Sequence, residues 1–221
     1  MYYFGTSIII HKMELINRLL TANKSWAARQ LEVDEAYFDN LAKDQKPDFL
    51  WIGCSDSRVP AEDLTGSQPG EMFVHRNVAN LVVHTDMNML SVLQYAVEVL
   101  KVRHILVVGH YQCGGVKASM MHKDLGLINR WLHNIKDVYD KYATELDAIE
   151  DEKVRFDRLV ELNVIQQVHN LAQTSIVQGA WHQGQEVHLH GWVFGLHDGQ
   201  LKTLAHMPPT TKVEGIYRYD F

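Results

Sequence analysis

The sequence predicts an α/β fold with a mostly parallel central β-sheet flanked by helices, preceded by an N-terminal helical arm. Continuous apolar runs at 49–54 and 104–110 are typical of strands buried on both faces, as in parallel sheets. An apolar pattern of helical period lies between them at 87–100. Strands that alternate with helices in this way indicate parallel neighbours joined by helical crossovers.

The N-terminal part of the chain is expected to be helical. Leucines and a tryptophan recur at roughly helical spacing over 14–30, and a second short helix is expected over 33–43. Pro47 ends this region and leads into the first strand.

The remaining elements follow in chain order. Asp86 is suited to cap the helix 87–100, and Asp198-Gly199 to turn one late strand into the next. The long helical stretch from 116 to 180 exceeds one crossover, so we expect it to wrap outside the core or to build a subunit interface. The further expected elements are strands over 71–79, 186–196 and 200–205 and helices over 116–122, 127–144 and 153–180.

The length of 221 residues suits one domain with a sizeable core. We predict a single α/β domain over 1–221, in which 13–45 forms the helical arm. Residues 1–12 precede Met13 and are either an upstream extension or an arm that packs on a neighbouring subunit.

Composition excludes several classes of protein. Apolar content of 46% and charged content of 22% are ordinary for a soluble globular protein. A net charge of −6 without a basic stripe argues against nucleic-acid binding. No apolar run approaches the ~20 residues of a membrane helix, and the N-terminus lacks the basic region of a signal peptide. We therefore expect a cytoplasmic protein.

The first chemical motif is GCSDSRVP, residues 53–60. Cys54, Asp56 and Arg58 occupy alternate positions at the end of the first strand, so an extended backbone would point them to one side. A soft metal ligand, a carboxylate and a fixed cation at one strand end are an expensive combination for packing alone.

The second motif is HYQCGG, residues 110–115, between a strand and a helix. His110 and Cys113 can converge with Cys54, because ligands of α/β folds gather beyond the carboxyl ends of the strands. Two thiolates and one imidazole suit zinc, and three protein ligands leave an open position that is typical of a catalytic site.

Several alternatives stay open at this point. Asp56 could close the site as a fourth ligand, or pair with Arg58 and leave the position to water. Cys54 and Cys113 could be ordinary buried thiols, a disulfide or part of a structural zinc site. Both cysteines of the chain fall in the two motifs beside His110, which favours a metal.

Three motifs together resemble the β-class carbonic anhydrases, most closely the bacterial members. They are CSDSRV (54–59), HYQCGG (110–115) and, between them, GEMFVHRNVAN (70–80). The similarity extends over nearly the whole chain, from about Met13 through the 190s. It implies a zinc enzyme that reversibly hydrates CO2 to bicarbonate and a proton by zinc-bound hydroxide.

The resemblance also implies roles for particular residues. One Zn2+ per chain is expected on Cys54, His110 and Cys113, with Asp56 as a fourth ligand in a closed state. In the active state Asp56 pairs with Arg58 and water takes its place. The family is a dimer or larger homo-oligomer, here a dimer or tetramer, with pocket residues contributed across an interface. The substrate pocket of CO2 and bicarbonate maps onto Gln45, Phe73, Val78, Tyr95 and the backbone of Gly114.

Some similar bacterial proteins carry a regulatory bicarbonate pocket built from a Trp, an Arg and a Tyr. Trp51 and Arg76 fit this pattern, whereas Phe194 stands where the tyrosine is expected. The lost hydroxyl removes one hydrogen bond, worth about 0.5–1.5 kcal/mol. We therefore expect weak or absent bicarbonate inhibition through that pocket.

Three rival functions remain. The same scaffold could hydrolyse CS2 or COS, with altered access to the pocket. A non-catalytic, zinc-binding regulatory protein is favoured if Asp56 stays on the metal. A thiol-redox protein is disfavoured because Cys54 and Cys113 lie 59 positions apart, with no C-x-x-C motif.

Overall fold

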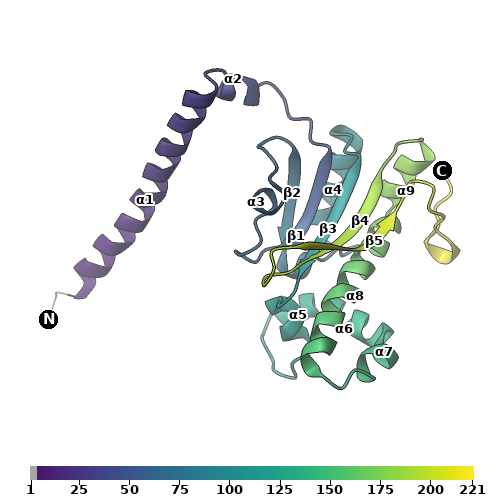
Figure 1. Cartoon of the computed structure of the whole chain (residues 1–221). Coiled ribbons are helices and arrows are strands. Elements are labelled where there is room, and N and C mark those ends of the chain that lie inside the picture. Colours follow the sequence, from purple (N-terminus) through teal and green to yellow (C-terminus); the bar gives the residue numbers. More distant parts are fainter. Residues whose placement is uncertain (1–3) are drawn as a thin grey trace. The chain divides into compact units, whose positions relative to one another are not determined.

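A computed structural model describes the backbone of residues 4–221 and the side chains of residues 14–221. The chain divides into two units, Met1–Gln45 and Lys46–Phe221. The first unit holds α1 (Phe4–Val33) and α2 (Tyr37–Leu41), at the two places where helices were expected (Figure 1). The predicted extension falls partly on residues 1–3, outside the described residues, and stays a prediction.

A five-stranded sheet forms the centre of the second unit (Figure 1). The strands run in the order β2-β1-β3-β4-β5, with β5 antiparallel to β4 and all other neighbours parallel. The mostly parallel sheet is thus confirmed. The strands are β1 (Phe49–Cys54), β2 (Met72–Asn77), β3 (His104–His110), β4 (His188–Phe194) and β5 (Leu201–Met207).

The helices begin and end largely where the sequence signals predict. Asp86 caps α4, since its side chain accepts a 3.0 Å hydrogen bond from the Asn88 amide. In the part of the chain that is described, no helix is both long and apolar enough to cross a membrane. The helices of this unit are α3 (Ala61–Thr65), η1 (Val78–Asn80), α4 (Met87–Gln94), the π-helical turn η2 (Tyr95–Val99), α5 (Gly114–Ser119), α6 (Ile128–Lys141), α7 (Ala143–Asp147), α8 (Glu152–Ala172), α9 (Ser175–His182) and η3 (Gly215–Tyr217).

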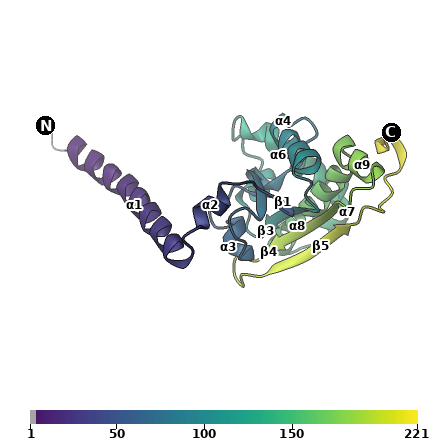
Figure 2. The same ribbon diagram turned by 90° about the horizontal axis from the view of Figure 1, so that it is seen from above.

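Helices α4, α8 and α9 cover one face of the sheet (Figure 2). Alternate strand residues point into this layer, because successive side chains of a strand face opposite sides. The core there includes Leu50, Ile52, Leu93, Ile105, Val107, Val164, Val168 and Leu189. The opposite face carries a smaller cluster in which α3 packs on Trp51, Leu106 and Val108.

One expectation about the long helical stretch is wrong, and of the two alternatives for its location, wrapping outside the core is excluded for α8, while a subunit interface stays a prediction. The helix expected over 153–180 is broken, because α8 ends at Ala172 and Thr174 caps a new helix by accepting a hydrogen bond from the Val177 amide at 3.3 Å. Helix α8 also does not wrap outside the core: Val164 and Val168 are completely buried against the sheet. It serves instead as part of the crossover between β3 and β4.

Candidate metal centre

The two chemical motifs meet at the carboxyl end of the sheet. Cys54 ends β1, His110 ends the neighbouring parallel strand β3, and Cys113 immediately precedes α5. Their ligand atoms all lie within 4.8 Å of one another, and the two sulfurs are 3.9 Å apart. All three side chains are buried, Cys54 at 6% exposure and the other two at 1%. The predicted convergence is therefore confirmed.

The orientation of His110 fits a metal ligand. Its Nδ1 lies 2.9 Å from the carbonyl oxygen of Tyr111, and because a carbonyl can only accept, Nδ1 carries the proton. Nε2 is then unprotonated and carries a free lone pair; the atom is buried and has no hydrogen-bond partner among the described residues. A buried polar atom without a partner is costly unless something else binds it. The two sulfurs beside it complete a donor set that suits zinc.

The two thiols are chemically unequal. Hydrogen bonding from Cys113 lowers the pKa of Cys54 to about 4 against the opposing effect of burial. The same hydrogen bond, together with burial, raises the pKa of Cys113. One thiolate is thus already favoured, and a divalent cation can displace the shared proton to make the second.

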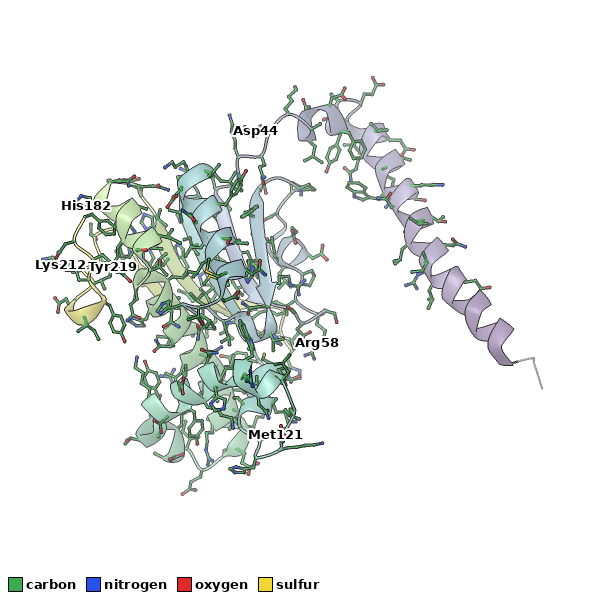
Figure 3. All side chains as sticks on the ribbon, turned by 180° about the vertical axis from the view of Figure 1, so that it is seen from behind. Asp44, Arg58, Met121, His182, Lys212 and Tyr219 are labelled. Atoms are coloured by element: carbon green, nitrogen blue, oxygen red, sulfur yellow. The ribbon has the colours of Figure 1, made fainter. Side chains whose placement is uncertain are left out.

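Asp56 and Arg58 form a bidentate salt bridge beside this centre. Strand β1 ends at Cys54, so the two residues lie in a turn and not on the extended strand that their alternation suggested. Arg58 donates from Nε to Oδ1 at 2.9 Å and from Nη2 to Oδ2 at 2.7 Å. Hydrogen bonds from Arg58 hold the pKa of the Asp56 carboxyl well below its usual range. Arg58 lies beyond the carboxyl end of β1, on the side of the sheet where α5 and α6 lie (Figure 3).

Asp56 is close enough to the ligand set to act on it. Its Oδ2 lies 3.7 Å from Nε2 of His110, beyond hydrogen-bond distance. The arrangement therefore combines a buried ligand set with an ionised carboxylate that is held to one side by Arg58.

The motif turn is fixed by a residue whose structural role the sequence did not reveal. Arg76, on β2, donates from Nε to the Cys54 carbonyl at 2.9 Å and from Nη2 to the Asp56 carbonyl at 2.5 Å. The guanidinium thus binds the backbone on either side of Ser55. Only the parallel register, which places Arg76 opposite Gly53, brings it there.

A second support comes from η1. The backbone of Ala79 is one of the groups that lower the pKa of Cys54, and Ala79 itself has a positive φ of 65°. Asn163 of α8 donates to the Ala79 carbonyl at 3.1 Å, and the Trp131 indole to the Val78 carbonyl at 2.8 Å. No local pattern could have predicted these contacts, since they join segments far apart in the sequence.

The expected substrate-pocket residues do not all gather here. Val78 and Gly114 adjoin the centre, one in η1 and one at the start of α5. Phe73 and Tyr95 contact each other, with ring centroids 5.8 Å apart, but Phe73 precedes the end of β2 by four residues. Gln45 belongs to the first unit and stays a prediction.

The proposed regulatory pocket is partly assembled. Trp51 and Arg76 point to the same face of neighbouring strands, and the buried indole nitrogen of Trp51 has no hydrogen-bond partner among the described residues. Phe194 ends β4 opposite His110. The Arg76 guanidinium, however, is already engaged by two backbone carbonyls.

Sequence comparison points to one family. A model of the carbonic anhydrase family matches residues 49–201. A carbonic anhydrase of Emericella nidulans is 50% identical over 188 residues, which cover 85% of this chain and 82% of that protein. One of Pseudomonas aeruginosa is 40% identical over 173 residues, covering 76% and 77%. Fungal and bacterial relatives both match, and of these two the fungal protein is the more similar, so the expected greater similarity to bacterial members is wrong.

Structural comparison agrees. A tetrameric β-carbonic anhydrase from Sordaria macrospora matches with a TM-score of 0.83 and 39% identity, covering 88% of this chain and 99% of that chain. A Coccomyxa β-carbonic anhydrase in complex with acetazolamide matches with the same TM-score of 0.83 and 42% identity, covering 86% of each chain.

Proposed function

We propose the detailed function of this chain from one premise: it belongs to the β-class carbonic anhydrase family and is a carbonic anhydrase. The family implies CO2 as the substrate, and the Cys2His set is typical of zinc in this family. We infer one zinc ion per chain, held by Cys54, His110 and Cys113, and reversible hydration of CO2 to bicarbonate and a proton. Zinc bound there supplies the Lewis acidity that makes a water molecule nucleophilic near neutral pH.

The observation that carries this proposal is the pairing of Asp56 with Arg58. The two hydrogen bonds of 2.9 and 2.7 Å use both carboxylate oxygens and keep the carboxylate off the ligand set. A fourth position is then left for water. This is the open state that catalysis needs, and it disfavours a permanently closed regulatory protein.

In this state each residue has a separate task. Asp56 stays ionised because of Arg58, so it can accept a hydrogen bond from the attacking water and orient it. Cys54 and Cys113 contribute negative charge, and the Tyr111 carbonyl holds the ring of His110 in its ligating orientation. Arg76 fixes the backbone that carries both Cys54 and Asp56.

We propose that the substrate wall is completed by a second copy of the chain. Phe73 and Tyr95 form an aromatic pair away from the ligand set of their own chain, and Tyr95 is 45% exposed. A half-buried phenylalanine beside an exposed tyrosine is suited to line a small apolar pocket across an interface. Val78 and the backbone of Gly114 then come from the chain that holds the zinc, and Gln45 hydrogen-bonds the bicarbonate. The Sordaria macrospora relative is tetrameric, which supports a homo-oligomer here.

Bicarbonate inhibition through Trp51, Arg76 and Phe194 is expected to be weak. Phe194 offers no hydroxyl, and the Arg76 guanidinium holds two backbone carbonyls. An anion there would have to compete with those bonds. Activity that falls steeply with bicarbonate, independently of pH and ionic strength, contradicts this expectation.

The test is CO2 hydration by stopped flow from pH 6.5 to 9 on the zinc-loaded chain, with Cys54→Ala as the control. We expect activity already near neutral pH in the parent and none in the control. No activity at any pH, with one zinc per chain still bound, would refute the proposed open state. Turnover of CS2 or COS but not CO2 would point to the rival hydrolase.

A further inference from the structure

We propose a second cation site on the sheet face opposite the α4, α8 and α9 layer, away from the zinc centre. Four histidines from three adjacent strands line it as two pairs, His104 with His190 and His188 with His206, and each pair offers two nitrogens to one ion. The ligand is a divalent transition-metal ion that favours imidazole, such as Zn2+, Cu2+ or Ni2+.

The sheet register builds this cluster. His104 of β3 is paired with His188 of β4, and His190 of β4 with His206 of β5. Residues 104, 188 and 190 alternate with the buried residues Ile105 and Leu189, so their side chains point to the face of the sheet opposite those two residues. All four rings are in contact: the centroids of His190 and His206 lie 4.8 Å apart, and those of His104 and His190 5.3 Å apart.

Two pairs of ring nitrogens are hydrogen-bonded at a distance that also suits two ligands of one metal ion. Nδ1 of His104 lies 3.2 Å from Nε2 of His190, and Nδ1 of His188 lies 3.2 Å from Nε2 of His206. Two imidazoles bound to one tetrahedral zinc at about 2.0–2.1 Å place their nitrogens about 3.3 Å apart. Each pair is therefore a preformed two-nitrogen clamp once a tautomer with both facing nitrogens unprotonated is adopted, and water fills the remaining positions.

Two of the four rings, His104 and His190, are held in the neutral form that binds metals. Burial, and then the neighbouring histidines, lower the pKa of His190 to about 4 and also lower that of His104. Of the charged side chains nearby, Arg103 acts on His104 in the same direction and Asp48 in the opposite one. At neutral pH these two rings are uncharged, so a cation meets no positive charge on them and requires only that the proton of the His104–His190 hydrogen bond move to the outer nitrogen of its ring.

The site is both accessible and separate from the zinc centre. His206 is exposed and gives a cation a path to the half-buried rings. His104 and His110 stand at opposite ends of β3, six residues or about 20 Å apart. The inference therefore does not depend on the activity proposed above.

The experiment counts metal on the full-length chain. Protein with zinc in the Cys2His site is equilibrated with micromolar free Zn2+, and bound zinc per chain is measured by mass spectrometry. We expect at least one further equivalent in the parent and about tenfold or more weaker binding of it in H104N/H206N, since even an outer-shell change costs 10–100-fold. H122N, an exposed histidine outside the cluster, is the matched control and should keep the further equivalent.

A second measurement does not depend on the variants. Cu2+ added to the zinc-loaded parent should give an electron paramagnetic resonance spectrum with coupling to at least two imidazole nitrogens. The proposal is overturned by a parent that binds one zinc only, by a further equivalent that survives in H104N/H206N or vanishes equally in H122N, or by a copper spectrum without nitrogen coupling. Retained CO2 hydration and an unchanged circular dichroism spectrum verify that the double variant is folded.

Discussion

Asn163 gives the sharpest test of how the α8 helix supports the zinc centre. Its side chain is 1% exposed, donates to the Ala79 carbonyl at 3.1 Å and accepts from Nε2 of Gln167 at 2.9 Å. Leucine has a similar size but neither polar atom. Asn163→Leu therefore leaves the Ala79 carbonyl and the Gln167 amide without these partners while filling most of the same space.

The expected loss of stability follows from these two groups. A buried polar group that loses its partner costs about 1–3 kcal/mol, so the pair costs about 2–6 kcal/mol. The added apolar burial of leucine offsets roughly 1.5–3 kcal/mol at most. With the midpoints of these ranges, about 4 kcal/mol lost and about 2 kcal/mol regained, we expect a net loss of about 2 kcal/mol, and roughly 2–4 °C in Tm for each kcal/mol in a chain of this length.

Activity should fall together with stability, because the Ala79 backbone that Asn163 holds helps to lower the pKa of Cys54. The assay is thermal unfolding at fixed protein concentration, beside the kcat/KM of CO2 hydration for the folded fraction. Gln166→Leu, a half-exposed neighbour on the same helix, is the control and should change Tm far less. Unchanged Tm and activity in Asn163→Leu, or equal losses in the control, would show that this hydrogen-bond chain does not support the site.

Three further predictions test the surroundings of the centre. Arg76→Ala should speed zinc removal by a chelator about 10–100-fold, and Arg76→Lys should not restore retention, because a lysine cannot hold two carbonyls with a rigid fork; wild-type retention in either variant contradicts this role. The pKa of Asp56 is lower in the folded chain than the ordinary carboxyl value of about 3.9, so the pair with Arg58 stabilises the fold above that pH and this contribution is lost as the pH falls below it. In Arg58→Ala the free energy of unfolding should therefore fall less steeply between pH 6 and 2 than in the parent. An identical pH dependence in the two proteins would refute the linkage. Gly115→Ala places a Cβ 2.8 Å from Cγ1 of Val78 in η1 and should lower the free energy of unfolding, measured in urea, by about 1–3 kcal/mol. Gly114→Ala meets nothing within 4 Å and should leave that free energy nearly unchanged. Equal losses in the two variants would rule out the collision.

Several parts of the fold could be predicted from local pattern. The apolar runs that became β1 and β3 were readable because a strand buried on both faces needs apolar residues at nearly every position. The candidate metal site could be predicted because Cys54 and His110 end those strands and Cys113 comes three residues after His110. Asp86 was a correct cap because its chemistry acts within two residues of its own position.

Other features escaped because local pattern does not encode them strongly. The break between α8 and α9 is carried by Thr174 alone, while the apolar periodicity continues on both sides of it. The turn at Asp56 looked like a continued strand, since alternation of side chains cannot say where pairing stops. The buried role of α8 depends on the sheet it covers, which lies in distant sequence.

The sequence by itself determined the α/β class, the candidate metal site of Cys54, His110 and Cys113, and the family. Tertiary structure decided which state Asp56 adopts, that Arg76 holds the turn beneath it, and that four histidines from three strands share one face. The reason is physical: helix and strand periods act over a few residues, whereas strand register is set by the packing of whole layers. Contacts such as Arg76 to Cys54 or His190 to His206 exist only once that register is fixed.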